Sequence, residues 1–147
     1  MLEIKQIDPE KTFEIRQRIL RPNQTIEECK YEFNDHPDSF HAGAYVEQKL
    51  ISIASFSKEQ HPDVPGENHY RLRGMATMPG YRNRKAGSSV LFYAESILKS
   101  RNVSTWWCNA RESVSGYYEK LGCFAIGELF EIKPIGMHRL MYKILED

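Results

Sequence analysis

The segment YRNRKAGSS, residues 81–89, gathers residue types that bind phosphate, directly before a run with helical spacing. It combines cationic, small and hydroxyl side chains: Arg82, Arg84, Lys85, Ala86, Gly87, Ser88 and Ser89. The first N–H groups of a helix have no partner inside the helix and lie at the positive end of its dipole, so they attract anions. The segment is therefore a candidate phosphate site, although a solvated loop with a glycine accounts for the same residues.

Two regular elements are expected to position this turn. Residues 69–78, HYRLRGMATM, alternate as a strand does, with one face made of Tyr70, Leu72, Gly74 and Ala76 and the other of Arg71, Arg73, Met75 and Thr77. Residues 86–100 carry an apolar stripe at helical spacing, formed by Val90, Leu91, Ala94, Ile97 and Leu98. The turn joins the end of the strand to the start of this amphipathic helix.

The rest of the chain predicts a mixed α/β order in one domain, 1–147. Upstream we expect a strand at 2–7 and a helix to about Leu20 that begins with Asp8 as its N-cap and Pro9 at its first position. A short helix from Asn23 or Thr25 to near Tyr31 is expected next, then a hairpin of strands 41–47 and 49–58 around Gln48. Downstream we expect a strand at 104–110, a helix over 113–121 ended by Gly122, and strands at 123–130 and 136–144.

Composition excludes several classes of protein. Hydrophobic residues at 41% and charged residues at 27% are typical of a soluble globular protein, and we expect neither a signal peptide nor a membrane span. The three cysteines form no C-x-x-C pair, which favours reduced thiols in the cytoplasm over disulfides or a metal site. Residues 1–70 carry 8 Lys/Arg against 13 Asp/Glu, and residues 71–147 carry 12 against 7. No acidic residue lies between Asn68 and Ala94, a basic field that suits a small anion better than a nucleic acid.

The basic turn resembles the signature of the GNAT superfamily of N-acetyltransferases. That signature, (Arg/Gln)-x-x-Gly-x-(Gly/Ala), matches at Arg82 and Gly87, with Lys85 in place of the middle glycine. A second landmark, Tyr-x-Lys-x-Gly-Phe, matches at Tyr118, Lys120 and Gly122, with Cys123 in place of the aromatic residue. The blocks ILRPNQ, LISIASF, LRGMAT, KAGSS, WCNAR, SGYY and HRLMYK further resemble the glyphosate N-acetyltransferases within this superfamily. The resemblance implies the GNAT fold, a mostly antiparallel central sheet splayed between its fourth and fifth strands and flanked by helices.

The resemblance also implies acetyl-CoA as cofactor, and no metal. Residues implied to hold it come from the fourth strand, the basic turn and the segments that follow: Met75, Ala76, Thr77, Arg82, Asn83, Lys85, Ala86, Gly87, Ser88, Ser89, Asn109 and Ser115. Lys85 departs from the family pattern, but its N–H group and its side chain can both reach a phosphate.

Acetyl transfer to an amine needs a base, an acid and a donor to the carbonyl oxygen. Histidine suits the first role because its ordinary pKa is about 6.5. The resemblance implies that His138 is the base, although a strand-edge histidine with an ordinary hydrogen bond fits the same sequence. It implies that Tyr118 gives a proton to the CoA thiolate, whereas Tyr117 is expected in the core. The N–H group of Met75 is the candidate donor to the carbonyl oxygen, and the other four histidines show no notable setting.

The substrate prediction depends on three arginines, Arg21, Arg73 and Arg111. Taken one by one, each is more typical of a surface ion pair. The planar guanidinium group binds carboxylate and phosphonate with two hydrogen bonds, and the resemblance implies that these three hold a small anionic amine. It also implies that Tyr31 lines the substrate pocket and that Ile132 and Ile135 lie in a covering loop. Such a set argues against polyamine or aminoglycoside substrates.

Other functions stay open on the sequence alone. A GNAT enzyme could acetylate a peptide or another metabolite, and a non-catalytic domain could bind acyl-CoA. A nucleic-acid-binding domain would need exposed aromatic residues, but Trp106 and Trp107 inside an apolar strand predict core positions. We expect direct attack by the amine without an acetyl-cysteine intermediate, because no cysteine lies beside an evident base.

Overall fold

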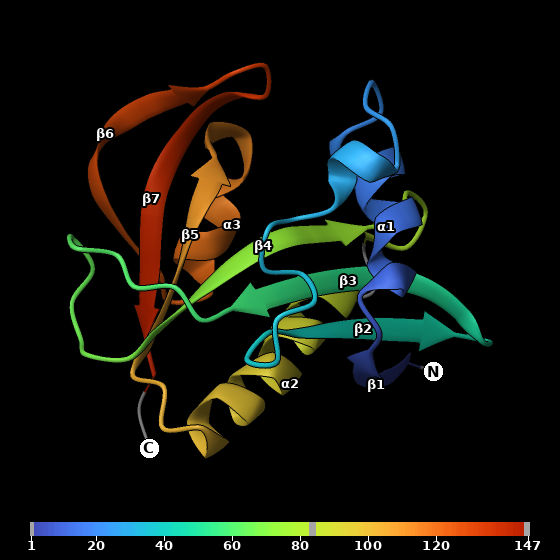
Figure 1. The fold of residues 1–147 in the computed structure, drawn as a ribbon, viewed down its shortest axis with the longest axis horizontal. Coiled ribbons are helices and arrows are strands. Elements are labelled where there is room, and N and C mark those ends of the chain that lie inside the picture. The colour runs from blue at the N-terminus through green and yellow to red at the C-terminus, as the bar shows by residue number, and fades with distance from the viewer. Residues whose placement is uncertain (1, 83–84, 146–147) are drawn as a thin grey trace. The chain divides into compact units, whose positions relative to one another are not determined.

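The computed structural model describes residues 2–82 and 85–145, which contain both strands and helices (Figure 1). The strands are β1 (Leu2–Ile7), β2 (Phe40–Val46), β3 (Lys49–Ser57), β4 (His69–Thr77), β5 (Thr105–Arg111), β6 (Phe124–Ile132) and β7 (Gly136–Ile144). The helices are α1 (Glu10–Ile15), the π-helix η1 (Arg16–Leu20), α2 (Ala86–Ser100), α3 (Ser115–Lys120) and the 3-10 helices η2 (Glu27–Cys29) and η4 (Glu112–Val114).

The chain divides into two compact units. Unit 1 comprises Met1–Lys58 and Leu72–Ile97, and unit 2 comprises Glu59–Arg71 and Leu98–Asp147. The strand order is β1-β2-β3-β4-β5-β7-β6, with β4 and β5 parallel. This is the mixed α/β sheet that the sequence predicts, and the expectation of one domain over 1–147 stays a prediction. No helix in the described part of the chain is long and apolar enough to cross a membrane.

Unit 1 is built on the predicted hairpin of β2 and β3. The rings of Phe40 and Phe56 stack across it with centroids 5.2 Å apart. The turn residues Glu47 and Gln48 both have positive φ, 49° and 69°, as a two-residue turn requires if it is to match the twist of the strands. α1 packs against β3, and the core beneath it contains Ile15, Ile53, Ala76 and Met78.

The first helix corrects two details of the prediction. Its N-cap is Pro9, and no side-chain hydrogen bond caps it, so Asp8 does not have the role that we expected. Asp8 instead offers its carbonyl to the N–H of Lys11 at 3.0 Å. From Arg16 the chain continues as a π-helix, in which the N–H of Arg21 bonds the carbonyl of Arg16 at 3.2 Å. Arg16 and Arg21 therefore bracket one wide turn.

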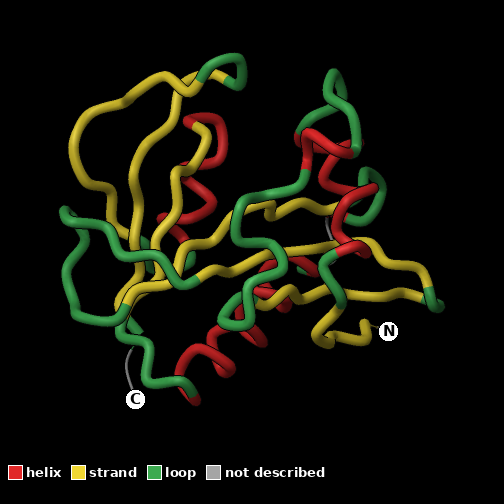
Figure 2. The backbone as a smooth tube through the Cα atoms, in the orientation of Figure 1, coloured by secondary structure: helices red, strands yellow, loops and turns green. Residues whose placement is uncertain are grey.

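The second predicted helix is only the single turn η2, and most of residues 21–39 is loop (Figure 2). The N–H of Thr25 bonds Glu28 Oε1 at 2.9 Å, and the N–H of Glu28 bonds Thr25 Oγ1 at 3.2 Å. This reciprocal pair is a capping box, which starts the turn at one of the two predicted positions. The extended conformation of Lys30 ends it.

In unit 1, β4 departs from regular alternation at Gly74, whose φ is 63°. A Cβ atom at this position would lie 2.9 Å from Arg16 Nε and 3.1 Å from both Cε2 and the hydroxyl oxygen of Tyr31. Glycine is needed here both for its backbone conformation and for this close approach. Gly74 therefore faces the fully buried Arg16 and the half-buried Tyr31.

In unit 2, β5 pairs with the start of β4 in parallel, matching Tyr70 with Trp106, and with β7 in antiparallel register. Trp106 and Trp107 are buried, as predicted. β6 pairs with β7 through a bulge that contains Gly127, with φ 74°. The core of this unit includes Val64, Trp107 and Leu140.

Helix α3 ends as predicted at Gly122, whose φ is 98°. The N–H of Gly122 bonds the carbonyl of Glu119, and the N–H of Cys123 bonds the carbonyl of Tyr118, each at 3.0 Å. These two bonds define a Schellman motif, in which a left-handed residue satisfies the last helical carbonyls. The motif keeps Tyr118 in the last turn of the helix.

Candidate active site

In unit 2, the structure brings two of the predicted residues together on neighbouring strands. Arg111 on β5 lies directly opposite His138 on β7, and Phe130 on β6 lies opposite His138 on the other side. Directly opposed residues project from the same face of an antiparallel pair, with Cβ atoms about 5 Å apart. The rings of Phe130 and His138 lie 6.2 Å apart. Arg111 and Phe130 therefore flank the predicted base.

The hydrogen bond of His138 identifies its tautomer. Its Nδ1 lies 2.7 Å from the carbonyl oxygen of Gly136. A carbonyl oxygen can only accept, so Nδ1 carries the proton. In the neutral ring Nε2 then has a free electron pair, as a general base needs. The residue is only 4% exposed, so its ring has little contact with bulk water.

The sequence predicts a core position for Tyr117, but the buried tyrosine of α3 is Tyr118. Tyr118 is buried against Trp106, and Tyr117 is 37% exposed. The expectation that Tyr117 is a core residue is wrong, because α3 is a short surface helix with only one face covered. Burial raises the pKa of Tyr118 well above its ordinary value, and Cys108, Tyr117 and Cys123 add to the effect. At neutral pH the phenol therefore keeps its proton.

Cys108 is buried on β5, and burial raises the pKa of its thiol, with Cys123 adding to the effect. The nucleophilic form of cysteine is the thiolate. A thiol whose pKa is raised stays protonated at neutral pH, so Cys108 is poorly suited to attack a thioester. Its setting agrees with the expectation that no acetyl-cysteine forms.

In unit 1, Tyr31 is stacked between two guanidinium groups. Arg16 Cζ lies 3.8 Å and Arg73 Cζ lies 3.9 Å from the centroid of its ring. One face of a phenol ring has no room for two guanidinium groups this close to its centre, so they occupy opposite faces. Arg73 and Tyr31, both predicted site residues, are thus in direct contact. Arg16 is a third member, which no sequence pattern identified.

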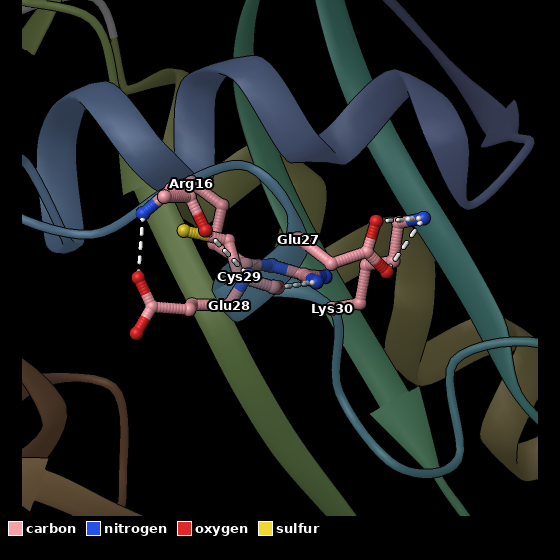
Figure 3. Close-up of polar contacts among 6 residues, drawn as sticks. Arg16, Glu27, Glu28, Cys29 and Lys30 are labelled. Atoms are coloured by element: carbon pink, nitrogen blue, oxygen red, sulfur yellow. Dashed lines mark hydrogen bonds and ion pairs between the residues drawn. The ribbon is translucent and has the colours of Figure 1, made fainter.

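Arg16 is fully buried and bonded to neutral acceptors. Nη1 donates to the carbonyl of Cys29 at 2.8 Å and to Asn34 Oδ1 at 3.2 Å, and Nη2 donates to Ser55 Oγ at 2.8 Å. Figure 3 shows the guanidinium group reaching across to Cys29 beside the ion pair of Lys30 and Glu27, whose atoms are 3.2 Å apart. Burial, with the nearby charges of Arg73 and Arg21, lowers the pKa of Arg16 to about 10. The group is therefore still charged at neutral pH.

Arg21 follows this turn directly and is half-buried. Its Nε is buried without a hydrogen-bond partner, as is Nε of Arg16. Within the described residues neither arginine forms a salt bridge with an acidic side chain. A buried N–H group of a cationic side chain attracts an anion when it has no hydrogen-bond partner. Unit 1 thus holds a cluster of three arginines, Arg16, Arg21 and Arg73, of which the first two lack an acidic partner in the described chain.

The basic turn leads into α2 as predicted, and Asn83 and Arg84 lie outside the described residues. Lys85 has φ 57°, so it adopts the left-handed conformation typical of the glycine that it replaces in the family pattern. α2 begins at Ala86, and no acidic residue occurs in its first turn, which contains Gly87, Ser88 and Ser89. Arg82 and Lys85 are exposed. These residues fit the pyrophosphate of a coenzyme, which would be held by helix N–H groups and two cations.

The other predicted cofactor residues lie on β4, β5 and α3. In unit 1, Thr77 Oγ1 bonds Ser52 Oγ at 2.8 Å, and Arg82 Nε donates to the carbonyl of Thr77 at 3.3 Å. Ala76 is buried and Met75, which follows Gly74, is half-buried. In unit 2, Asn109 is half-buried on β5, and Ser115 Oγ donates to the carbonyl of Glu112 at 3.0 Å.

The two predicted covering residues begin and end one tight turn of unit 2. The N–H of Ile135 bonds the carbonyl of Ile132 at 2.8 Å, between β6 and β7. Ile132 is the last residue of β6, and both side chains are half-buried. The described residues contain no group of three or more His, Cys, Asp or Glu side chains arranged to hold a metal ion.

The comparisons with known proteins place the chain in a family. A model described as the acetyltransferase (GNAT) family matches residues 3–123. The chain is 52% identical over 145 residues to the uncharacterized N-acetyltransferase YitI of Bacillus subtilis (strain 168), covering 99% of this chain and 97% of YitI. The chain therefore belongs to the GNAT family, and it is an acetyl-CoA-dependent N-acetyltransferase.

Solved structures agree with this fold. A putative N-acetyltransferase from Lactobacillus plantarum has a TM-score of 0.78 and 16% identity, with 99% of each chain covered. An aminoglycoside 6'-N-acetyltransferase complexed with coenzyme A has a TM-score of 0.72 and 14% identity, with 99% of this chain and 98% of that chain covered. At these identities the likeness concerns the fold. The mixed sheet with parallel β4 and β5 is thus the predicted GNAT fold.

Proposed function

We propose that this enzyme acetylates the amine of a small anionic substrate, an amino-acid-like carboxylate or an aminophosphonate of the glyphosate type, by direct attack. The observation that carries the proposal is the arginine cluster of unit 1. Arg16 and Arg21 have no acidic partner among the described residues, and Arg73 stacks on the same tyrosine ring as Arg16. A cluster of this charge favours carboxylate and phosphonate and repels polyamines.

Each predicted residue has one role in the proposal. Arg21 and Arg73 in unit 1 and Arg111 in unit 2 hold the anionic groups. Tyr31 lines the substrate site, and the turn from Ile132 to Ile135 covers it. The residues assigned to the coenzyme are the described members of the set predicted from the sequence: Met75, Ala76, Thr77, Arg82, Lys85, Ala86, Gly87, Ser88, Ser89, Asn109 and Ser115.

The coenzyme supplies an activated acetyl thioester. His138 takes a proton from the substrate ammonium at Nε2, because Nδ1 is occupied by its bond to Gly136. The N–H of Met75 stabilises the carbonyl oxygen as negative charge develops on it. Tyr118 gives its proton to the departing thiolate. Burial raises the pKa of this phenol, so Tyr118 still holds its proton at neutral pH when the thiolate departs.

The test is turnover of acetyl-CoA with a panel of amines: glyphosate, 2-amino-3-phosphonopropionate, aspartate, serine, spermidine and a short peptide. We expect kcat/KM to be much higher for the anionic amines than for spermidine or the peptide. His138→Ala should lower kcat about 10²- to 10⁴-fold while acetyl-CoA still binds. His36→Ala is the matched control, because His36 lies on an exposed turn.

Two results would contradict the proposal. Efficient turnover of spermidine or the peptide would leave the family assignment intact and refute the anionic substrate. Binding of acetyl-CoA without turnover of any amine would instead favour a non-catalytic acyl-CoA-binding domain. An activity of His138→Ala equal to that of His36→Ala would remove His138 from the role of base.

A further inference from the structure

We propose that Arg16 is a positioning residue that sets specificity for anionic substrates, by holding the ring of Tyr31 and, through the ring, the guanidinium group of Arg73. Arg16 is not among the residues expected to touch substrate. The inference rests on the proposed function, because it explains how one of the anion-binding arginines is oriented.

Within the described part of the chain, Arg16 is a buried charge that is bonded only to neutral groups. The side chain is fully buried, and its hydrogen bonds go to a backbone carbonyl, an amide oxygen and a hydroxyl oxygen. Among the described residues no carboxylate neutralises it. Burying a charge on neutral acceptors alone is costly to stability. Three bonds from three different segments nevertheless fix the guanidinium plane in one orientation.

Tyr31 contacts a guanidinium group on each face of its ring. The ring rests on the fixed plane of Arg16 at 3.8 Å and carries Arg73 on its other face at 3.9 Å. Cation–π attraction and stacking favour both contacts. Since Arg16 cannot move without breaking its three bonds, it limits the position of the ring, and the ring limits the position of Arg73.

Arg16 and Tyr31 pack closely against Gly74 on β4. A Cβ atom on Gly74 would lie 2.9 Å from Arg16 Nε and 3.1 Å from Tyr31. The residue next to Arg73 on the strand must therefore be glycine for Arg16 and Tyr31 to occupy their places. The strand and the two side chains form one packed unit, and Arg73 extends from it.

The charges of the three arginines affect the binding of an anionic substrate. The charges of Arg73 and Arg21 both act on Arg16, so the cluster is self-repulsive. An anion that binds at Arg73 relieves this repulsion, whereas a neutral amine does not. Arg16 should therefore affect the KM of anionic substrates selectively.

The main experiment compares Arg16→Lys with Arg18→Lys. Lysine keeps the charge but loses the planar group that stacks on Tyr31. Arg18 lies two residues away, pairs with Glu14 and has 56% of its side chain exposed, so it is the matched control. The anionic probe is 2-amino-3-phosphonopropionate, and the probe without an acidic group is serinamide.

For Arg16→Lys we expect the KM for the phosphonate probe to rise on the order of tenfold. The KM values for acetyl-CoA and serinamide should stay unchanged within about twofold, because neither depends on the orientation of Arg73. Arg18→Lys should change none of the three KM values.

A double-mutant cycle with Tyr31→Leu tests the route through the ring. If Arg16 acts through Tyr31, Arg16→Lys should add less than about twofold to the KM for the phosphonate once Tyr31 is leucine. Effects that multiply would refute the route. An equal rise in all three KM values for Arg16→Lys, or no rise at all, would refute the positioning role.

Ser55→Ala tests the same proposal if Arg16→Lys does not fold. It removes one acceptor of Arg16 and keeps the guanidinium group. We expect the same selective rise in KM at about threefold, and an unchanged specificity would overturn the inference. Wild-type enzyme that does not prefer the phosphonate to serinamide would refute the proposed function, and this inference with it, before any variant is made.

Discussion

His138 and Tyr118 hold their protons in different ways. His138 donates one proton to the carbonyl of Gly136, which leaves the other nitrogen of its ring available as an acceptor. Tyr118 is buried, and burial raises its pKa so that the phenol stays protonated. The first residue is prepared to accept a proton and the second to give one. The hydrogen bond of His138 and the burial of Tyr118 therefore support the proposed roles of base and acid.

Tyr118→Phe tests the role of the acid. Phenylalanine keeps the ring that packs against Trp106 and removes only the hydroxyl. We expect kcat to fall about 10²-fold, with the KM values of both substrates little changed. Tyr117→Phe is the matched control on the next residue, which is 37% exposed. Steady-state kinetics with the best amine of the panel measures both, and equal effects of the two variants would rule out Tyr118 as the acid.

The short helices and the β2–β3 hairpin of this chain depend for their formation on the residues at their ends. α3 spans only Ser115–Lys120, and the Schellman motif at Gly122 completes it. η1 is a π-helix that joins Arg16 to Arg21, and π-turns of this kind often occur at functional sites. The β2–β3 turn carries two residues with positive φ that are not glycine. Each of these ends determines where a neighbouring side chain of the site or core lies.

Substitutions in the β2–β3 turn should therefore increase the free energy of unfolding. Glu47→Asn combined with Gln48→Gly supplies residues that accept positive φ at low cost, and we expect a gain of about 1 kcal/mol in the free energy of unfolding. Denaturation in urea at constant m-value measures the gain. Asn102→Gly is the control, because Asn102 has φ 60° and asparagine already tolerates that conformation. A gain from Asn102→Gly as large as that of the double variant would contradict the explanation.

A buried polar network ties together distant segments of unit 1. His41 Nε2 lies 3.0 Å from the carbonyl of Asn34, and its Nδ1 lies 2.7 Å from Ser55 Oγ. Because the carbonyl can only accept, Nε2 carries the proton, and Nδ1 accepts from the hydroxyl of Ser55. That hydroxyl oxygen in turn accepts from Arg16. In this arrangement neutral His41 gives the hydroxyl proton of Ser55 an acceptor.

The pH dependence of stability follows from this network. Burial, helped by the charge of Arg16, lowers the pKa of His41 despite opposing effects from Asn34, Asp35 and Glu10. Below the ordinary pKa of about 6.5, the unfolded chain binds a proton that the folded chain does not. Stability is thus fully present above that pH and is lost as the pH falls toward the folded-state pKa, by about 1.4 kcal/mol per pH unit.

His41→Gln should reduce that loss. Glutamine can donate to Asn34 and accept from Ser55, but it has no proton to gain in this range. Unfolding midpoints measured from about pH 7.5 to about pH 5.5, on either side of the ordinary histidine pKa, should decrease less for His41→Gln than for wild type. His36→Gln on the exposed turn is the control. An equal decrease in all three proteins would show that His41 does not cause the acid sensitivity.

Most of the secondary structure, and the family, could be predicted from the amino-acid sequence without coordinates. Alternation located β1 and β4, helical spacing located α2, and Gly122 located the end of α3, because these signals are local and repeat within a few residues. The other strands were also predicted close to where they lie. The same local motifs, at Arg82, Gly87 and Tyr118, carried the resemblance to GNAT enzymes. The capping role of Asp8 and the length of the second helix were wrong, because the N-cap of α1 is Pro9 and the extended Lys30 ends η2 after a single turn.

Which polar side chains are buried together became known only from the folded chain. Nothing in the local pattern distinguishes the buried Arg16 from the exposed Arg18, or the buried His41 from the exposed His36. The contact of Tyr31 with both Arg16 and Arg73 joins residues from η1, a loop and β4. Such contacts depend on chain segments that are distant in sequence and meet only on folding, so their chemistry belongs to the fold and is absent from any single stretch of the chain.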